Sequence, residues 1–287
     1  MENIHFSNEN SKELFEQSRS DPELTKALLR ECMEAEKYDA AMIFADQLAG
    51  LMPDSYEPVH AKCAVLLRKK QLGEVGLCIA AAQDRFGDDP NYINDRLAYT
   101  IDVMGTEAAQ KYLDKIAKKP AYESRQFLDL CARVYYDTDE SKYIKCLFIL
   151  HKQFQSEHAR FMLALKSIEH QKYEAALKWY VAVINGYSGS AEYYMSLAGR
   201  CSLLQLLQRE NWQEEMRKAA VEIDLASSTH IDSLWLRTLS EQLWEILGNK
   251  KAAQYNHEIV EELKKYAENP EKYIKNLQAV NSGETRE

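Results

Sequence analysis

The feature that most constrains the fold is a short sequence motif that occurs twice in the chain. Residues 36–50 read EKYDAAMIFADQLAG and residues 171–186 read QKYEAALKWYVAVING. Each copy places three small or apolar residues one turn apart on one helical face, so the chain repeats an amphipathic helix. These residues are Ala41, Ala45 and Leu48 in the first copy and Ala176, Tyr180 and Val183 in the second.

The same helix recurs between the two copies at a fixed period. Counting forward from Ala41 in steps of 34 residues leads each time to another set of apolar residues spaced one helical turn apart. The last step is one residue shorter. A second apolar stripe lies twelve residues before each anchor. This period predicts tandem pairs of helices, each of which needs its neighbours to bury its apolar face. The anchors are Ala41, Val75, Ala109, Tyr143 and Ala176, and the upstream positions are Leu29, Cys63, Leu97, Cys131 and Ala164.

Turn residues fall between the predicted helices. Ten Gly and six Pro in 287 residues indicate few and short loops. Within the pairs we predict turns at residues 36–37, 71–73, 105–106, 138–141 and at Gln171. A sixth, longer unit follows, with helices from Tyr194 to Leu207 and over residues 211–226, and a seventh pairs residues 233–247 with residues 250–267. From Ala198 to Ser240 the step is 42 residues, so the pitch of the array changes there.

These patterns predict one continuous array with capped ends. Residues 1–21 are expected to form an N-terminal capping segment, and residues 22–266 about seven helix pairs in one solenoid. Residues 267–280, which contain Asn269-Pro270 and a polar helical pattern, are expected to be a C-terminal capping helix. Residues 281–287, NSGETRE, are predicted to be a disordered tail.

Two units carry the resemblance to a known family. Leu163-Ala164 is followed by Ala176-x3-Tyr180, and Leu28-Leu29 by Ala41-x3-Ala45 and Pro53. This resembles the tetratricopeptide repeat (TPR) family, with degenerate repeats. The resemblance implies an all-α, right-handed superhelical solenoid of helix-turn-helix repeats. It also implies that the first helices line a concave groove that binds extended peptides or helices of partner proteins.

Composition argues against several other classes. The formal net charge of −9 disfavours nucleic-acid binding, which needs a basic surface. The first residues show no signal peptide, and the longest apolar runs, such as CLFIL at 146–150, are too short for membrane insertion. The six cysteines form no C-x-x-C pair and fall on apolar stripes, which indicates buried thiols in a reducing compartment. We therefore predict a cytoplasmic protein.

Three motifs approach catalytic or metal-binding patterns without completing them. HEIVEE at 257–262 has Glu261 where a zinc helix needs its second His. GYSGS at 186–190 ends in Ser rather than Gly and lies between helices, unlike a nucleophile elbow. DTDES at 137–141 lacks most ligands of a calcium loop. We therefore predict no enzyme activity, no catalytic residue, no metal site and no cofactor.

The resemblance places the partner-binding residues on the first helices, opposite their packing stripes. Lys26 lies where a TPR carboxylate clamp would begin, but Arg30, Ala61 and Asp95 replace the other clamp residues, so a receptor for acidic tails is doubtful. The middle of the face is apolar and aromatic, which suits an amphipathic partner helix. The same residues could instead pack between repeats. The candidates are Lys26, Arg30, His60, Asn94, Arg125, Tyr135, Phe161, Leu165 and Trp244.

The leading hypothesis for function is a non-enzymatic adaptor or scaffold that binds a protein or peptide in its groove. One alternative is a regulatory peptide receptor that changes curvature on binding. Another is a homo-oligomeric assembly subunit, which associates through the long sixth unit or the C-terminal helix. RNA binding is the weakest alternative because of the net charge.

Overall fold

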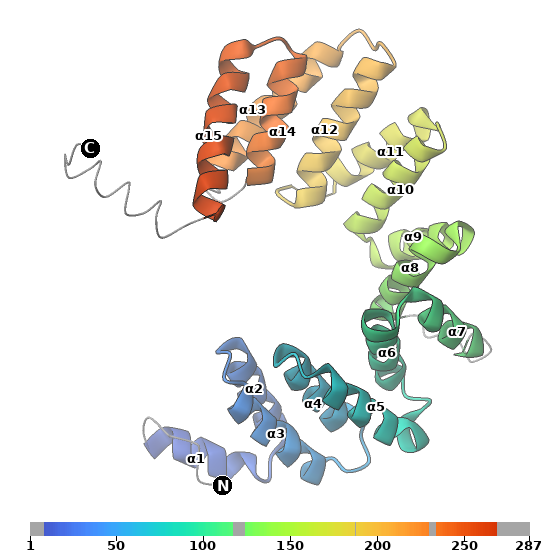
Figure 1. The fold of residues 1–287 in the computed structure, drawn as a ribbon, viewed down its shortest axis with the longest axis vertical. Coiled ribbons are helices and arrows are strands. Elements are labelled where there is room, and N and C mark those ends of the chain that lie inside the picture. The colour runs from blue at the N-terminus through green and yellow to red at the C-terminus, as the bar shows by residue number, and fades with distance from the viewer. Residues whose placement is uncertain (1–8, 117–123, 187, 230–233, 269–287) are drawn as a thin grey trace, which may run out of the picture. The chain divides into compact units, whose positions relative to one another are not determined.

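The computed structural model describes residues 9–116, 124–186, 188–229 and 234–268, and within these residues the regular structure is helical throughout. Helix α1 (Glu9–Ser18) precedes seven consecutive helix pairs (Figure 1). The pairs are α2 (Pro22–Glu34) with α3 (Tyr38–Leu51), α4 (Glu57–Arg68) with α5 (Leu72–Phe86), α6 (Pro90–Tyr99) and its π-helical extension η1 (Thr100–Met104) with α7 (Thr106–Ile116), α8 (Arg125–Thr138) with α9 (Glu140–Phe154), α10 (Glu157–Glu169) with α11 (Tyr173–Ile184), α12 (Ala191–Leu206) with α13 (Trp212–Thr229), and α14 (Leu234–Ile246) with α15 (Lys250–Glu268).

The start of most first helices is set by a polar cap. Asp21 accepts hydrogen bonds from the backbone N–H groups of Glu23 at 2.9 Å and Leu24 at 3.1 Å, and Pro22 occupies the first turn of α2. Such caps satisfy N–H groups that have no partner inside the helix, and each contributes about 1 kcal/mol. The side chains that cap α6, α8, α10 and α12 in the same way are Asp89, Ser124, Ser156 and Ser190.

Five first helices end in the same turn. The residue after the helix cap is left-handed, and the next residue donates its N–H to a carbonyl five positions earlier, as in the Schellman motif. In α2, for example, the N–H of Lys37 bonds the carbonyl of Cys32 at 2.8 Å. Only one of the five left-handed residues is glycine. They are Glu36 (φ 56°), Lys70 (φ 60°), Gln171 (φ 57°), Gln208 (φ 51°) and Gly248 (φ 71°).

The structure confirms most of the turn positions that the sequence predicted. Left-handed residues or breaks occur at Glu36, Gly105, Asp139 and Gln171. The turn predicted at 71–73 lies slightly earlier, because Lys70 closes α4 and α5 already begins at Leu72. Gly73 therefore lies within a helix rather than in a turn.

The chain divides into two compact units at Cys146–Leu147, within α9. In each unit the predicted anchors form the core between paired helices. All five anchors are buried, from 0 % exposed for Ala41, Ala109 and Ala176 to 4 % for Tyr143. Among the upstream positions Cys63, Leu97, Cys131 and Ala164 are buried, whereas Leu29 is half-buried. The 34-residue period therefore located the core correctly.

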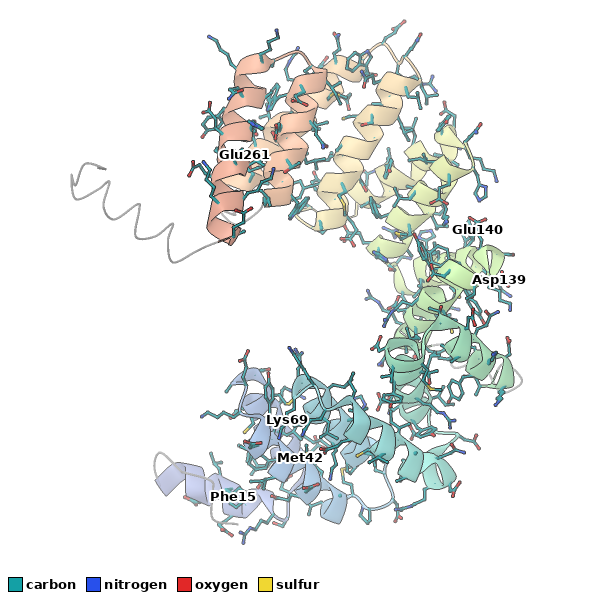
Figure 2. All side chains as sticks on the ribbon, viewed as in Figure 1. Phe15, Met42, Lys69, Asp139, Glu140 and Glu261 are labelled. Carbon is teal, nitrogen blue, oxygen red and sulfur yellow. The ribbon has the colours of Figure 1, made fainter. Side chains whose placement is uncertain are left out.

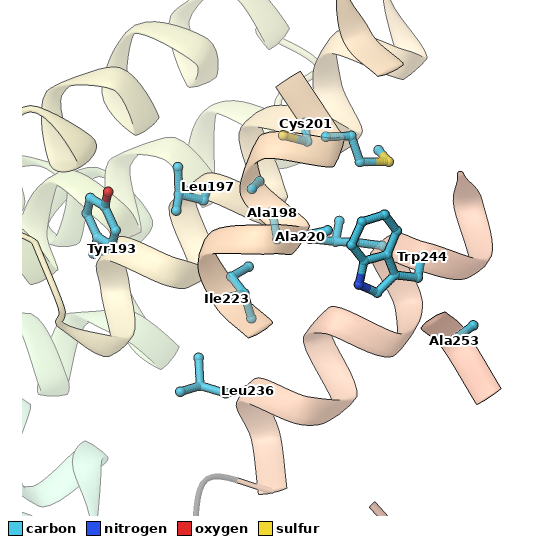
Figure 3. Close-up of a cluster of buried hydrophobic side chains, with 12 residues drawn as sticks. Tyr193, Leu197, Ala198, Cys201, Ala220, Ile223, Leu236, Trp244 and Ala253 are labelled. Carbon is cyan, nitrogen blue, oxygen red and sulfur yellow. The ribbon is translucent and has the colours of Figure 1, made fainter. Parts of the chain in front are cut away.

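Unit 2 (residues 147–287) has a large apolar cluster between α12, α13, α14 and α15 (Figure 3). Met216, Ala220 and Ile223 of α13 are completely buried there, and Leu236 and Trp244 of α14 close it from the other side. Burial of such side chains contributes roughly 1.5–3 kcal/mol each, so this cluster holds the longer sixth pair against the seventh.

The predicted end segments lie partly outside the described residues. The structure describes residues 9–21 of the predicted N-terminal segment, which include α1, but not residues 1–8. Of the predicted C-terminal cap only Ala267 and Glu268 are described, as the end of α15. The cap beyond them, the tail and the single continuous solenoid remain predictions.

Candidate partner-binding face

The first helices of neighbouring pairs approach one another within each unit. In unit 1 (residues 1–146) α4 contacts α6 and α6 contacts α8, and in unit 2 α10 contacts α12 and α12 contacts α14. In the part of the chain that is described, successive second helices share no contact of comparable extent. Each unit therefore presents a face of closely spaced first helices, which we call the first-helix face.

Lys26 bridges two first helices in unit 1. Its Nζ lies 2.8 Å from a carboxylate oxygen of Glu57 on α4 and 2.9 Å from one of Glu23 on its own helix. The hydrogen bonds to Glu57 and Glu23 raise the pKa of Lys26. The candidate clamp residue is thus already neutralised by this chain, and a ligand carboxylate would have to compete with two others.

His60 continues the pattern one pair further along. Its Nδ1 lies 2.8 Å from Oδ2 of Asp95 on α6, and the hydroxyl of buried Tyr56 donates to the same oxygen at 2.9 Å. The hydrogen bond with Asp95 raises the pKa of His60, against the opposing effect of burial. Asp95 of α6 is therefore tied to the start of α4 through both the His60 ring and the Tyr56 hydroxyl.

The remaining unit 1 candidates have diverse surroundings. Arg30 is exposed and has no ion-pair partner among the described residues, whereas exposed Arg125 lies 3.7 Å from Asp129. Asn94 is only 4 % exposed, and its Oδ1 has no hydrogen-bond partner in the described structure. Half-buried Tyr135 has Lys142 Nζ 5.1 Å from its ring centre, and burial raises the pKa of its phenol to about 12.

The first-helix face of unit 2 has an apolar hollow instead of a bridging ion pair at its centre. The hollow has a volume of about 450 Å³ and lies between α10 and α12. Leu206 is 60 % exposed at its rim, while Ile168 is half-buried. The lining residues are Ile168, Gly199, Ser202, Leu203, Gln205 and Leu206.

A missing side chain lets α12 approach its neighbour beside this hollow. A Cβ atom at Gly199 would lie 2.7 Å from Cζ of Tyr180, a buried residue of α11. Contacts under 3.0 Å force a shift of rigid neighbours, so the position requires glycine at this helix spacing. The close packing brings the backbone of α12 down to the floor of the hollow.

The unit 2 candidates divide between the surface and the interior. Phe161 is 9 % exposed and packs with Ala164 and Tyr180 in a core cluster, and half-buried Leu165 packs against that cluster. Trp244 is 8 % exposed, and its Nε1 donates to Asp224 at 2.8 Å. With Asn94, Phe161 and Trp244 buried, the candidate contacts that reach the surface are the other six.

Two partly buried polar networks join the helices of unit 2. The carboxylate of Asp224 on α13 accepts from Ser240 at 2.5 Å, from Trp244, and from Asn256 of α15 at 3.1 Å, which ties three helices together. Arg160 donates to His151 at 3.1 Å, to Gln155 and to the carbonyl of Ala182 at 3.3 Å. These bonds join the start of α10 to the ends of α9 and α11.

Sequence reasoning missed the residues that form the rim of the hollow. Leu206 and Ser202 were not among the candidates. The available signal was the pair of leucine doublets, Leu203-Leu204 and Leu206-Leu207, because a single packing stripe cannot bury all four. Leu203 and Leu204 are buried, Leu207 is half-buried, and Leu206 faces solvent.

The near-miss motifs have structural roles in the part of the chain that is described. Glu261 pairs with Lys264 at 2.8 Å on α15, and Asp139 caps α9 by accepting the N–H of Lys142 at 3.0 Å (Figure 2). Ser190 caps α12 by accepting the N–H of Tyr193 at 3.0 Å, while Tyr187 of the same motif lies outside the described residues. Glu261, Asp139 and Ser190 thus each contact a neighbouring side chain or the local backbone.

The cysteines of the described chain are all unpaired. Cys63, Cys131, Cys146 and Cys201 are buried, and burial raises the pKa of the Cys63 and Cys131 thiols to about 12. Such thiols stay protonated and behave as small apolar side chains. Among the described residues no three His, Cys, Asp or Glu side chains gather as metal ligands would, and no helix has the length and apolarity to cross a membrane.

Comparisons with known proteins show the fold. No family model and no curated protein sequence matches the chain. PilF of Pseudomonas aeruginosa has a similar structure, with a TM-score of 0.58 at 12 % identity, over 79 % of this chain and 98 % of PilF. A weaker match is a Naa15/Naa10 complex bound to HypK-THB, with a TM-score of 0.43 at 14 % identity, over 91 % of this chain and 39 % of that chain. Another is an IFIT1 monomeric mutant with m7Gppp-AAAA, with a TM-score of 0.49 at 13 % identity, over 88 % of this chain and 66 % of that chain.

These neighbours contain TPRs. The match to PilF and the seven consecutive helix pairs confirm the all-α, TPR-like helical-repeat fold that the sequence predicted. At 12 % identity the similarity extends to the fold and not to a function.

Proposed function

We propose that the protein is a non-catalytic adaptor that binds an apolar segment of a partner protein on the first-helix face of unit 2. The observation that carries the proposal is the hollow between α10 and α12, with Leu206 exposed at its rim. A leucine that is 60 % exposed beside a concave apolar surface gains burial when a partner side chain enters.

The size of the hollow indicates the kind of ligand. About 450 Å³ accommodates one or two large apolar side chains, which an amphipathic helix would supply from successive turns. Half-buried Leu165 and exposed Met195 extend the apolar surface along α10 and α12. A partner helix with apolar residues at i, i+3 or i+4, and i+7 would therefore fit this face.

The ion pairs of unit 1 argue against two other ligand classes. The carboxylate partners of Lys26 and His60 occupy the positions that an acidic peptide would take. One structural neighbour, IFIT1, was solved with a capped RNA, m7Gppp-AAAA. Here the cations of the first-helix face are largely paired with carboxylates, and the chain carries a net charge of −9, so we propose a protein ligand. Six cysteines without disulfides fit a reducing compartment, and we propose the cytoplasm.

The test uses the purified full chain and peptides selected from a displayed library of random helical sequences. Fluorescence anisotropy then compares the affinity of the selected peptides for wild type, Leu206→Glu and Val181→Glu. Val181 is a matched control, because it is 38 % exposed on α11, a second helix of the same unit. We expect Leu206→Glu to weaken binding at least about tenfold and Val181→Glu to leave it unchanged.

Thermal melts should show that both variants remain folded, because Leu206 is 60 % exposed and Val181 is 38 % exposed. Equal binding to wild type and Leu206→Glu would show that the peptides bind elsewhere. Equal losses in both variants would show that the contact is not specific to the hollow. Either result would refute the proposed binding face.

A further inference from the structure

The outer side of α13 carries an apolar pair that the proposed partner-binding face does not use. Val221 is 54 % exposed and Leu225 is 68 % exposed. Among the described residues they are the only two exposed large hydrophobic side chains that lie one turn apart on the same helix. Charged and apolar side chains share this face of α13: Glu214, Arg217, Lys218, Val221, Glu222 and Leu225.

The charges around this pair are balanced, although the chain as a whole is acidic. Two acidic and two basic side chains surround Val221 and Leu225. Lys218 lies 2.9 Å from Glu214 and 3.4 Å from Glu215 on its own helix, and Glu222 accepts from the hydroxyl of Tyr193 at 2.5 Å. The side chains of Lys218 and Glu214 are about two-thirds exposed, unlike that of Lys26, so this internal pair is weak and Lys218 can exchange it for another carboxylate. Lys218 and Glu222 are one turn apart, so they lie along the same flank of the helix.

We propose that this side of α13 is a self-association surface, on which α13 of a second copy of the chain packs antiparallel to the first. In an antiparallel pair related by a two-fold axis, each flank of a helix meets the same flank of its copy in reverse order. Because Lys218 precedes Glu222 on one flank, reversal places Lys218 of each copy opposite Glu222 of the other. The surface is therefore complementary to itself.

Charge also selects the register. A pair centred on Ala220, midway between Lys218 and Glu222, makes two ion pairs and brings the two Val221 side chains together near the axis. A pair centred on Ile223 would pack Val221 on Leu225 but would bring the two Glu222 carboxylates close together. Like charges at such spacing are unfavourable, so the structure favours the register centred on Ala220.

The surface leaves the proposed partner-binding face free. Val221 and Leu225 lie on a second helix, whereas Ile168 and Leu206 lie on first helices of the same unit. A dimer formed through α13 would therefore keep one partner site on each copy. Two linked sites raise the apparent affinity for a partner that has two binding segments.

The test is the oligomeric state of the full chain by sedimentation over a concentration range up to about 100 µM, where a weak specific dimer is populated. We expect a reversible dimer for wild type. Val221→Glu should raise the dimer dissociation constant about 100-fold, because the two Val221 side chains meet near the axis, so each dimer loses two buried valines and brings two like charges together. Lys218→Glu should raise it about tenfold, and Lys218→Glu combined with Glu222→Lys should restore it to within about threefold of wild type.

The matched control is Leu77→Glu on α5, because Leu77 is 72 % exposed on a second helix of unit 1. It should leave the dimer intact, and thermal melts should show that all variants remain folded. A wild-type chain that stays monomeric, a dimer that only Leu77→Glu disrupts, or a double charge swap that fails to restore association would each overturn the proposal. Dimerisation of a chain shortened by residues 269–287, but not of the full chain, would also overturn the proposal, because that segment would then be what covers Val221 and Leu225 in the full chain.

Discussion

The two units use the same helix pairs but give their first-helix faces different chemistry. In unit 1 side chains from successive first helices meet as ion pairs, Lys26 with Glu57 and His60 with Asp95. In unit 2 one such pair occurs among the described residues, His158 with Glu192 at 3.1 Å at the starts of α10 and α12, and an apolar hollow bordered by Leu206 lies toward the ends of the same helices. Unit 1 thus joins its first helices through ion pairs, whereas unit 2 has an apolar hollow between two of its first helices.

The difference shows that a repeat architecture does not determine what each repeat binds. The buried anchors that define the pairs, such as Ala41 and Ala176, are alike in both units. The residues on the other sides of the same helices are free to vary, because they contribute little to the core. Exposed ion pairs add roughly 0–1 kcal/mol, so replacing them with apolar side chains changes binding more than stability.

The largest effect should come from the polar networks. Asp224→Ala in unit 2 removes the acceptor of Ser240, Trp244 and Asn256, of which the first and last are almost fully buried. We expect a loss of about 3 kcal/mol in the free energy of unfolding. Asp95→Ala in unit 1 affects only Tyr56 and half-exposed His60, and should cost about 1 kcal/mol. Urea denaturation of both variants measures the difference, and a larger loss for Asp95→Ala would contradict it.

Two glycine substitutions should have opposite signs. Gly199→Ala in unit 2 drives a methyl group into Tyr180 and should destabilise the protein by about 1–3 kcal/mol. Gly73→Ala in unit 1 meets nothing within 4 Å and should stabilise it by about 0.5 kcal/mol through helix propensity. Thermal melting of the two variants checks both signs. A neutral Gly199→Ala would mean that α11 and α12 can separate without cost.

The pKa values of two histidines, one in each unit, should be shifted in opposite directions from the ordinary value. The hydrogen bond with Asp95 raises the pKa of His60, so its stabilisation is complete below the unfolded value near 6.5 and is lost as the pH rises through the folded value. Burial and the nearby Arg160 and Lys152 lower the pKa of His151, so stability falls as the pH drops below about 6.5. NMR titration of the two imidazoles measures both shifts.

The control for the histidine titration is Asp95→Asn. It should return the pKa of His60 toward its ordinary value and leave that of His151 unchanged. Since His60 is half exposed, its contribution to stability should stay below about 1 kcal/mol. A His60 pKa that is unchanged by Asp95→Asn would exclude the hydrogen bond as the cause.

The smallest effect should come from the basic residues at the start of unit 1. Lys26→Glu combined with Arg30→Glu should change the affinity of peptides selected for the hollow of unit 2 by less than about twofold, because the hollow uses neither residue and exposed charges act weakly in salt. Fluorescence anisotropy with the same selected peptides measures this change. A strong loss of binding would instead favour recognition of an acidic peptide by the clamp position Lys26.

The repeat period predicted the core better than it predicted the binding face. Periodicity marks the apolar side of each helix, so anchors such as Val75 and Ala109 were located correctly. It does not indicate how closely neighbouring first helices approach. Nor does it show which side chains the second helices cover: Phe161 packs on Tyr180 of α11, and Trp244 bonds Asp224 of α13. Asn94, Phe161 and Trp244 are therefore buried, although all three were candidates for the groove.

The exposed pair on α13 was missed for a related reason. The sequence indicated that the sixth unit is long, but a long amphipathic helix can bury its extra residues or leave them outside. Packing against α14 and α15 uses Met216, Ala220 and Ile223, and this choice leaves Val221 and Leu225 on the opposite side. Only the three-dimensional arrangement of the neighbouring helices decides between these outcomes.

The left-handed turn residues imply that substitutions to glycine can raise the thermal stability of the protein. Glu36, Lys70, Gln171 and Gln208 each hold a backbone conformation that costs an L-residue about 1 kcal/mol more than glycine, partly offset by the greater freedom of glycine in the unfolded chain. The four turns are far apart in the chain, so the gains from glycine substitution should add. An engineered chain with all four glycines could tolerate hotter conditions without a change on either surface proposed for binding.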